Sequence, residues 1–291
     1  MISETTISST VVELLRLASF QLPFDVKEAL KKAFDNENEM VPKMQLKAIL
    51  DNIALAETRR TPLCQDTGIP LFFVTIGDLE TSDVQAAICQ GVVEATKTVP
   101  LRPNAVHPLS RKNSGNNIGE HMPYVHFRFS KKKYVELTVM PKGAGSENMN
   151  VLAMLSPSQG IKGIKEFVLS AVVRAGGYPC PPTILGIGIG GSSDIAMELS
   201  KEALLRSLNS RSQDAEVAEL ERELFEAING LGIGPMGLGG KTTALGVNIE
   251  YAYCHTASLP VALSFQCWAA RRATARMYAD GRVEYVLDVK G

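Results

Sequence analysis

A thiol, an amide, a carboxylate and a hydroxyl follow one another in the stretch Pro62-Leu63-Cys64-Gln65-Asp66-Thr67-Gly68. An apolar run, 69–74, comes next, so these side chains fall where a strand is expected to begin. Sites are often built at such boundaries between elements. We therefore treat Cys64 as a candidate metal ligand and Asp66 as a candidate proton-transfer residue beside it. The alternative role for Asp66 is to cap the following turn.

Two further cysteines occupy comparable positions. Cys180 stands between Pro179 and Pro181-Pro182, which hold the chain in an extended loop. Cys267 ends an apolar run that is expected to be a strand. The odd count of five scattered cysteines argues against a disulfide framework, and no C-x-x-C pair indicates a metal site, so structural roles stay open for each. Cys89 falls within an expected helix, where a buried apolar role is favoured.

Thiolates are the usual ligands of iron–sulfur clusters. If Cys64, Cys180 and Cys267 held a four-iron cluster, one iron would keep an open position. An open iron is a Lewis acid, which binds a substrate hydroxyl and carboxylate and makes the hydroxyl a better leaving group. The positions of the three cysteines at strand or loop ends support ligand roles better than their spacing does, and a cluster held in this way would be able to bind a hydroxyacid.

Composition and charge exclude several classes of protein. The 291 residues are 45% hydrophobic, which is enough for a sizeable core. The formal charge of −1 favours no nucleic-acid partner. No apolar stretch reaches the roughly 20 residues of a membrane span. The polar N-terminus lacks a signal pattern, so a cytoplasmic location without membrane association is the expectation.

The elements that would position these residues follow from hydrophobic periodicity. The fold class expected is α/β (mixed α+β), with a helical part at 1–60 and a cluster-binding part at 61–291 that together form one catalytic domain. Helices are expected at 8–19, 25–34 (with Asp25 as N-cap), 42–59, 83–98, 157–175, 193–205 and 215–231. In the helix 42–59, Leu55 is expected to face the core. Strands are expected at 69–76, 183–189, 245–253 and 261–266. The strands 124–129 and 134–140 are expected to form a hairpin around a lysine-rich turn, and a second hairpin closes the chain near Asp280.

Two glycine-rich segments resemble nucleotide-binding loops. Gly186-Ile187-Gly188-Ile189-Gly190-Gly191 fits G-x-G-x-x-G after a strand, but no second strand with an acidic end follows. Tight packing of strand against helix, or an anion cradle, is favoured over nicotinamide binding. Gly239-Gly240-Lys241-Thr242-Thr243 resembles the end of a phosphate-binding loop, yet Pro235 stands where the pattern needs glycine. A nucleotide triphosphatase is therefore not expected.

Taken together, several segments resemble the α subunit, or N-terminal domain, of iron–sulfur hydro-lyases of the class I fumarase type. They run in order from about residue 40 to residue 280, which makes the resemblance specific. The segments are 64–68, Leu101-Arg102-Pro103-Asn104-Ala105-Val106, Pro141-Lys142-Gly143-Ala144-Gly145-Ser146-Glu147-Asn148, 232–240, His255 in its turn, and Cys267-Trp268-Ala269-Ala270-Arg271-Arg272.

The resemblance implies a cofactor and a set of site residues. Cys64, Cys180 and Cys267 would hold a [4Fe–4S] cluster with one iron that no cysteine binds. Asp66 or His255 would serve in proton transfer. The dicarboxylate substrate would be contacted by Gln65, Asp66, Arg102, His255 and the backbone at Gly143 and Gly145. Arg102 suits a bidentate carboxylate contact, although it could be a surface residue and His255 a core residue. His107, His121 and His126 are taken as structural or surface residues.

Two departures from the family's pattern matter. Ala144 replaces the middle glycine of the glycine loop, while Gly143 and Gly145 are kept. The resemblance also implies a second, β-type domain that supplies further substrate-binding and catalytic residues, and nothing in these 291 residues corresponds to it. We expect activity only with a separate β subunit, as an α2β2 assembly.

The reaction implied is the reversible hydration of fumarate to (S)-malate. Ser146-Glu147-Asn148 after the glycine loop resembles the fumarase branch more than the tartrate branch. The alternatives are an L-tartrate dehydratase α subunit, a methylfumarate hydratase, or a non-catalytic iron–sulfur sensor, which would usually fill all four iron sites with protein ligands.

Overall fold

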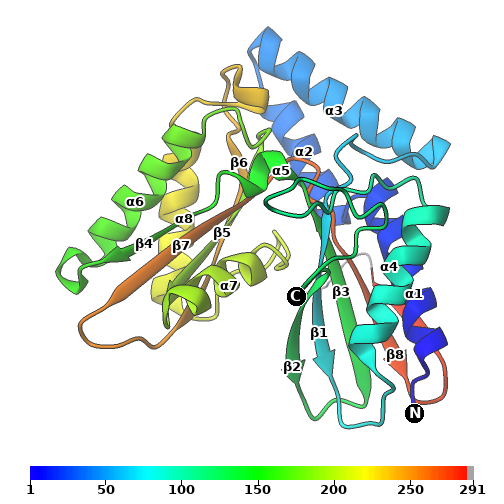
Figure 1. Cartoon of the computed structure of the whole chain (residues 1–291). Helices are drawn as coiled ribbons and strands as arrows, with labels where there is room; N and C mark the ends of the chain where they lie inside the picture. The colour runs from blue at the N-terminus through cyan, green and yellow to red at the C-terminus, as the bar shows by residue number, and fades with distance from the viewer. Residues whose placement is uncertain (287–291) are drawn as a thin grey trace. The chain divides into compact units, whose positions relative to one another are not determined.

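The computed structural model of the chain describes residues 1–286 and confirms the predicted mixed α/β class (Figure 1). These residues form two compact units, each assembled from separate stretches of chain. The first unit comprises Met1–Pro23, Asn52–Gly143 and the described residues from Arg271 on. The second comprises Phe24–Asp51 and Ala144–Ala270. The functional division at residue 60 stays a prediction.

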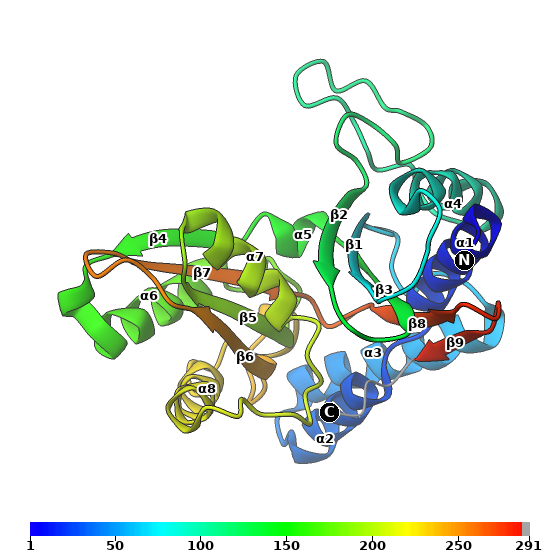
Figure 2. The ribbon, with the colours of Figure 1, turned by 90° about the horizontal axis from the view of Figure 1, so that it is seen from below.

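The first unit is a five-stranded sheet with helices α1 (Glu4–Phe20) and α4 (Val84–Thr98) over one face (Figure 2). Apolar side chains alternate along strand β1 (Ile69–Ile76), so that Phe72 and Val74 point into a core with both helices. The strand order is β2 (Tyr124–Phe129), β1 (Ile69–Ile76), β3 (Tyr134–Lys142), β8 (Ala273–Tyr278) and β9 (Val283–Val286).

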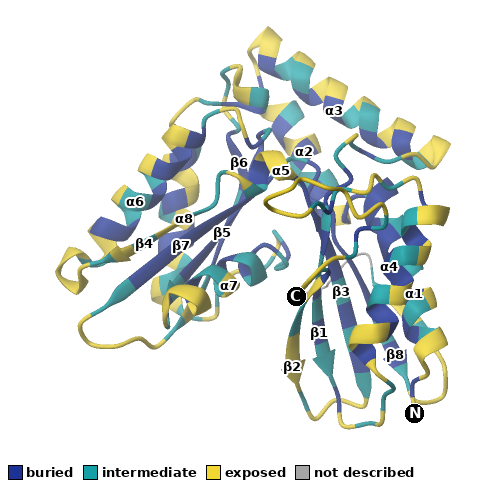
Figure 3. Cartoon of the chain, viewed as in Figure 1, coloured by how far each residue is buried: buried dark blue, intermediate teal, exposed yellow. Residues whose placement is uncertain are grey.

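The predicted hairpin between strands 124–129 and 134–140 is wrong. Both strands exist, but β1 lies between them and pairs parallel with β2 and antiparallel with β3. The lysine-rich turn therefore crosses over β1 instead of closing a two-stranded ribbon, and β2 becomes an exposed edge strand (Figure 3). The closing hairpin of β8 and β9 is confirmed.

Helices α1 and α4 begin at side-chain caps. Ser3 accepts a hydrogen bond from the N–H of Thr6 at the start of α1, and Asp83 accepts one from Ala86 at the start of α4. The helices cross closely because Gly91 leaves room for Val11, which a β-carbon at position 91 would meet at 2.6 Å. Cys89 lies on α4 as predicted, but it is only partly buried.

The second unit is a four-stranded sheet with helices on both faces. Helices α6 (Gly160–Ala175) and α8 (Ala215–Asn229) share a core with one face, and α7 (Ser193–Ala203) packs on the other. The strand order is β4 (Val151–Leu155), β7 (Leu259–Gln266), β5 (Thr183–Gly190) and β6 (Ala244–Ala252), and only β4 was not predicted.

The G-x-G-x-x-G segment serves this packing. A β-carbon at Gly186 would lie 2.1 Å from the carbonyl oxygen of Ser200, and one at Gly188 would lie 1.9 Å from that of Ala196. Both carbonyls belong to α7, so the glycines allow that helix to approach the backbone of β5. The preference for strand-to-helix packing over nicotinamide binding is supported.

Two further helices predicted in the N-terminal part of the chain are also present. The helices predicted at 25–34 and 42–59 correspond to α2 (Phe24–Asn36) and α3 (Met40–Arg59). Asp25 lies inside the first turn of α2 and not at its N-cap. Leu55, predicted to face the core, is 48% exposed, because the buried side of α3 carries Leu46, Ile49 and Ile53 instead. Short helices are α5 (Ala144–Glu147), η1 (Pro157–Gln159) and η2 (Pro235–Gly237).

Among the described residues, no helix combines the length and hydrophobicity that crossing a bilayer requires.

Candidate functional site

The loop from Cys64 to Gly68 joins the end of α3 to the start of β1 in the first unit. It is anchored by Leu63, whose N–H donates to Ser19 and whose carbonyl accepts from Asn52, both at 2.9 Å. Gly68 has a φ of +82°, and a β-carbon there would lie 2.8 Å from the backbone nitrogen of Lys142. Only glycine therefore lets the loop meet the end of β3.

The carboxylate of Asp66 lies where three segments of the first unit meet. Its Oδ1 accepts a hydrogen bond from the N–H of Gly68 at 3.0 Å and a longer one from Asn104 Nδ2 at 3.4 Å. Its Oδ2 would be 3.1 Å from a β-carbon on Gly143. The missing side chain at Gly143 thus leaves space beside the carboxylate, and Asp66 itself is only half-buried.

Arg271 supports the same loop from the far end of the sequence. Arg271 is 2% exposed, and its Nη1 donates to the carbonyl oxygen of Asp66 at 2.8 Å. Its Nη2 would be 3.6 Å from a β-carbon on Gly143, so the guanidinium and the Asp66 carboxylate border the same space. Arg271 was not predicted as a site residue, although it lies in a segment that carried the family resemblance.

Arg102 lies on a neighbouring loop of the first unit with its side chain exposed. Its backbone N–H donates to Thr67 Oγ1 at 2.9 Å, which ties the loop to the residue after Asp66. Asn104 adds a second tie, because its Nδ2 also donates to the carbonyl of Gly68 at 3.2 Å. The structure thus gathers Asp66, Arg102 and Gly143 in the first unit, where Gln65 is also exposed.

Cys180 lies in a strained loop of the second unit. Its φ is +54°, a conformation that residues other than glycine rarely adopt. Such strain is commonly kept at functional positions. The carbonyl oxygen of Cys180 accepts a hydrogen bond of 3.1 Å from the N–H of Trp268, the residue after Cys267. The two cysteine-bearing segments are therefore joined, and both cysteines are partly buried.

The glycine-rich segment 232–240 supports the Cys180 loop. Met236, itself at a φ of +56°, donates its N–H to the carbonyl oxygen of Pro181 at 2.7 Å. A β-carbon on Gly237 would lie 2.7 Å from the α-carbon of Gly177. This segment carried part of the family resemblance, but no role was assigned to it from the sequence. In the structure it acts as a brace, because its backbone contacts support the loop of the predicted ligand Cys180.

Gly145 and His255 also belong to the second unit. Gly145 lies in α5, and a β-carbon there would be 3.3 Å from the carbonyl oxygen of Tyr178, two residues before Cys180. His255 is exposed in the turn after β6, where its Nδ1 accepts a hydrogen bond from the N–H of Ala257 at 3.1 Å. It is thus not a core histidine.

The donor chemistry fits an iron–sulfur cluster. All five cysteines are thiols, and Cys180 and Cys267 are brought together within the second unit, whereas Cys64 belongs to the first. Within residues 1–286, no three His, Cys, Asp or Glu side chains are gathered as a metal-binding group. The joint ligand role of the three cysteines stays a prediction. The backbone hydrogen bond that joins the segments of Cys180 and Cys267 supports it.

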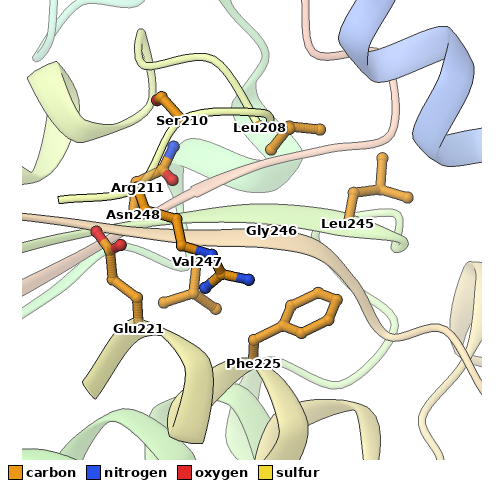
Figure 4. Close-up of a pocket in the computed structure, with 9 residues that line it drawn as sticks. All are labelled: Leu208, Ser210, Arg211, Glu221, Phe225, Leu245, Gly246, Val247 and Asn248. Carbon is orange, nitrogen blue, oxygen red and sulfur yellow. The ribbon is translucent and has the colours of Figure 1, made fainter. Parts of the chain in front are cut away.

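Other candidate sites have structural explanations. Lys241, in the segment that resembles a phosphate-binding loop, donates its N–H to the buried carboxylate of Glu37 at 2.8 Å and its Nζ to the carbonyl of Asn36 at 3.0 Å. A cavity of about 100 Å³ in the second unit is lined by Arg211, Phe225 and β6 residues and contains no predicted site residue (Figure 4).

The predicted histidine roles can be compared in the same way. His107 caps a turn through Nδ1, and the side chain of His121 is 86% exposed. His126 stacks on Phe73 with ring centroids 4.5 Å apart. All three are consistent with structural or surface roles.

Comparison with known proteins identifies the family. The family model of fumarate hydratase (fumerase) matches residues 8–276, so the chain belongs to this family. A protein of Methanocaldococcus jannaschii, provisionally named an L(+)-tartrate dehydratase subunit alpha, is 52% identical over 95% of this chain and 99% of its own length. The L(+)-tartrate dehydratase subunit alpha of Escherichia coli K12 is 36% identical over 94% of this chain and 91% of its own.

A third relative has a different length. The protein of Geobacillus stearothermophilus, provisionally named a class I fumarate hydratase, is 35% identical over 90% of this chain. The match covers only 53% of that protein, so this chain corresponds to about half of it. The predicted family and the enzyme class of a hydro-lyase are confirmed, while two of the three relatives carry the name of a tartrate enzyme.

Proposed function

We propose that this chain is the α subunit of an iron–sulfur hydro-lyase that interconverts fumarate and (S)-malate. The observation that carries the proposal is the half-buried Asp66 carboxylate, held by the Gly68 N–H and Asn104 beside Gly143, with Arg102 on a tied loop. A carboxylate for proton transfer and an exposed guanidinium for a substrate carboxylate are the groups that such a reaction requires.

The proposed cofactor is a [4Fe–4S] cluster held by Cys64, Cys180 and Cys267. When bound, it supplies a Lewis-acid iron for the hydroxyl group of the substrate. The two backbone bonds on the Cys180 loop, from Trp268 and Met236, support a ligand role, because they fix Cys180 and Cys267 without using the sulfur atoms.

The chain's own residues bind and orient the substrate in this proposal. Arg102 receives one carboxylate as a bidentate partner, and Gln65 donates to it through its amide. The backbone at Gly143 and Gly145 approaches the other carboxylate, where negative charge develops when the neighbouring carbon loses its proton. The short distance between Gly143 and Asp66, whose Oδ2 would lie 3.1 Å from a β-carbon at Gly143, supports this arrangement.

Two groups are proposed to transfer or orient the proton. Asp66 has one carboxylate oxygen engaged by the Gly68 N–H, which fixes the orientation of the other oxygen toward Gly143. His255 is exposed, and its Nδ1 accepts a hydrogen bond from Ala257, so Nε2 carries the proton when the ring is neutral. That arrangement makes Nε2 a hydrogen-bond donor toward substrate.

A separate β subunit is the proposed partner. Two relatives that match along nearly their whole length are named as alpha subunits, and the match with the longer Geobacillus relative covers about half of that protein. We propose an α2β2 assembly in the cytoplasm in which the β subunit completes the substrate pocket.

L-Tartrate dehydration is the second candidate function, because two of the relatives are named as tartrate dehydratase α subunits. Tartrate differs from malate by one hydroxyl group, and none of the described site residues distinguishes the two acids. In this alternative, the same Asp66 and Arg102 act on tartrate and the product is oxaloacetate.

The deciding experiment is anaerobic co-expression with the β subunit, followed by iron and sulfide determination and assays with fumarate, (S)-malate, L-tartrate and methylfumarate. We expect about four irons per α chain, as the proposed cluster requires, and interconversion of fumarate and malate. Oxaloacetate from tartrate with little malate turnover would establish the second candidate. A fully loaded complex that converts none of these acids, and whose cluster spectrum ignores them, would instead favour a sensor.

A further inference from the structure

The asparagine-rich segment 112–117 has no role in the function proposed above. In the sequence it is only a loop of turn-forming residues. In the structure it folds back on the segment 102–105, which carries Arg102 and Asn104. The inference drawn from this contact rests on the proposed roles of Arg102 and Asp66.

Asn117 makes the central contacts. Its side chain is 2% exposed, and its φ is +62°, which asparagine tolerates better than most residues. Its Oδ1 accepts the backbone N–H groups of Asn104 at 2.7 Å and Ala105 at 3.3 Å. Its Nδ2 donates to the carbonyl oxygen of Arg102 and to Thr96 Oγ1, both at 3.1 Å. All four hydrogen-bonding positions of the amide are used.

The rest of the segment adds weaker ties to the same stretch. Asn113 donates from Nδ2 to the carbonyl oxygen of Pro103 at 2.5 Å. The N–H of Ser114 donates to the carbonyl oxygen of Ala105 at 3.1 Å. Asn113 is exposed, so water competes for its bond. The buried Asn117 is therefore the contact whose loss costs most.

The two ends of the Asn117 amide reach different site residues. Through Nδ2 it holds the backbone of Arg102, whose exposed side chain has to meet a carboxylate in a defined direction. Through Oδ1 it holds Asn104, whose own side chain contacts Asp66 and Gly68. One buried amide thus links the proposed binding residue to the proposed proton-transfer residue.

We propose that Asn117 is a positioning residue that sets Arg102 for substrate binding and Asn104 for support of Asp66. It touches neither substrate nor cluster. Because its donor and acceptor act on different residues, they can be removed separately. The substitution Asn117→Asp replaces the donor to Arg102 and keeps the acceptor for Asn104. The substitution Asn117→Gly removes both and suits the positive φ.

The first measurement is independent of turnover. Hydrogen–deuterium exchange of the full chain is followed on the peptide that covers residues 101–106. In Asn117→Gly, the amides of Asn104 and Ala105 lose their acceptor, and we expect their exchange to speed up by roughly tenfold or more. In Asn117→Asp they keep it and stay protected. Unchanged exchange in Asn117→Gly would overturn the proposal, whatever the enzyme's substrate is.

The second measurement is the kinetics of the complex with the β subunit. We expect Asn117→Asp to raise KM for the dicarboxylate roughly tenfold with kcat changed less than about threefold, and Asn117→Gly to lower kcat as well. The matched control is Asn116→Asp, which adds the same charge one residue away and keeps the Oδ1 acceptor for Ile118. That control should leave KM and kcat within about twofold of wild type.

A double-mutant cycle separates positioning from general loss of structure. In an Arg102→Ala background, Asn117→Asp should change KM by less than about twofold, because its effect passes through Arg102. A full tenfold effect in that background would overturn the proposal. Failure of the wild-type complex to convert any of the tested acids contradicts the proposed function instead, and the exchange measurement still decides the role of Asn117.

Discussion

The backbone N–H of Trp268 donates a hydrogen bond of 3.1 Å to the carbonyl oxygen of Cys180, which brings the segment of Cys267 beside that of Cys180. Met236 holds the next carbonyl, that of Pro181, at 2.7 Å. Both bonds use backbone atoms only. The loop geometry around the two thiols is therefore supported by backbone contacts within the second unit.

The strained backbone of Cys180 predicts opposite effects on stability and on iron binding. At a φ of +54° a residue with a β-carbon is disfavoured by roughly 1 kcal/mol relative to glycine. We expect Cys180→Gly to leave the iron-free chain at least as stable as wild type in urea unfolding, while Cys180→Gly and Cys180→Ser both abolish cluster assembly. Iron and sulfide content measures the second effect.

The control for this pair is Cys254→Ser, which changes an exposed cysteine outside the proposed ligand set. It should keep full iron content. A normal iron content in Cys180→Ser would exclude Cys180 as a ligand. A clear loss of stability in Cys180→Gly would show that its backbone conformation carries no strain.

The brace behind the Cys180 loop gives a second prediction. Gly237 has a φ of +78°, and a β-carbon there would lie 2.7 Å from the α-carbon of Gly177. The substitution Gly237→Ala should push this part of the loop outward. We expect a lower iron content after anaerobic reconstitution and faster alkylation of Cys180 in the iron-free chain, measured by mass spectrometry.

Gly232→Ala is the matched control. Gly232 has a similar φ of +66°, but nothing lies within 4 Å of its β-carbon position. Both substitutions therefore introduce the same kind of backbone strain, and only Gly237→Ala adds a clash. Equal losses of iron in the two variants would mean that strain alone, and not contact with the Cys180 loop, accounts for the effect.

The sequence was sufficient to predict those elements that depend on residues close together in the chain. Helices such as α1 and α4 follow from apolar spacing, and the loop 112–120 follows from its turn-forming residues. The hairpin error shows the limit, because the turn 130–133 suggests pairing of its two flanking strands, whereas the position between them belongs to β1, more than 40 residues earlier in the chain. Strand order depends on such long-range pairing, which local pattern does not encode.

The candidate site shows the same division. The residue types at Cys64 and Asp66 suggested chemistry, and the family resemblance was needed to single out Arg102. The residues that support them could not be found in this way, because Arg271 contacts Asp66 across 205 residues of sequence. Asn117 contacts Asn104 across 13 residues, within one folded loop, yet it looks like an ordinary turn residue until its four partners are known. The segments that resemble the family indicated which parts of the chain form the site, but not which residues contact one another there.

Glu37 gives a prediction for acid stability. Glu37 lies in the loop that joins α2 to α3 in the second unit and is fully buried. Burial acts to raise the pKa of Glu37, but hydrogen bonds from the backbone N–H groups of Lys241, Glu39 and Asn38 outweigh it and hold the pKa below the ordinary value of 4.5. A lowered pKa in the folded state means that the charged form stabilises the fold above about pH 4.5, and that this contribution is lost as the pH falls further.

We therefore expect Glu37→Gln to lower the free energy of unfolding at pH 7 by roughly 1–3 kcal/mol, since charge-assisted bonds become neutral ones. The difference from wild type should shrink as the pH falls below about 4.5. Urea unfolding at pH 7 and pH 4 measures this, with Glu39→Gln, an exposed neighbour, as control. A difference that does not depend on pH would refute a role for the Glu37 charge.

The last prediction concerns Asp66. The substitution Asp66→Asn keeps the shape of the side chain and an Oδ1 that accepts the Gly68 N–H, but it removes the charge and the capacity to take a proton. We expect normal iron content and a kcat lowered by at least about 10²-fold in the anaerobic complex with the β subunit, the usual cost of losing a general acid or base. KM should change less, because Arg102 and the backbone at Gly143 stay in place.

Asp78→Asn is the matched control, since Asp78 is an exposed carboxylate of the same unit that pairs with Lys133 at 2.5 Å. It should leave both constants within about twofold of wild type, as exposed ion pairs contribute little. A near-normal kcat in Asp66→Asn would remove Asp66 from the proton transfer and leave His255 as the remaining proposed group, because no third side chain has been assigned to that step.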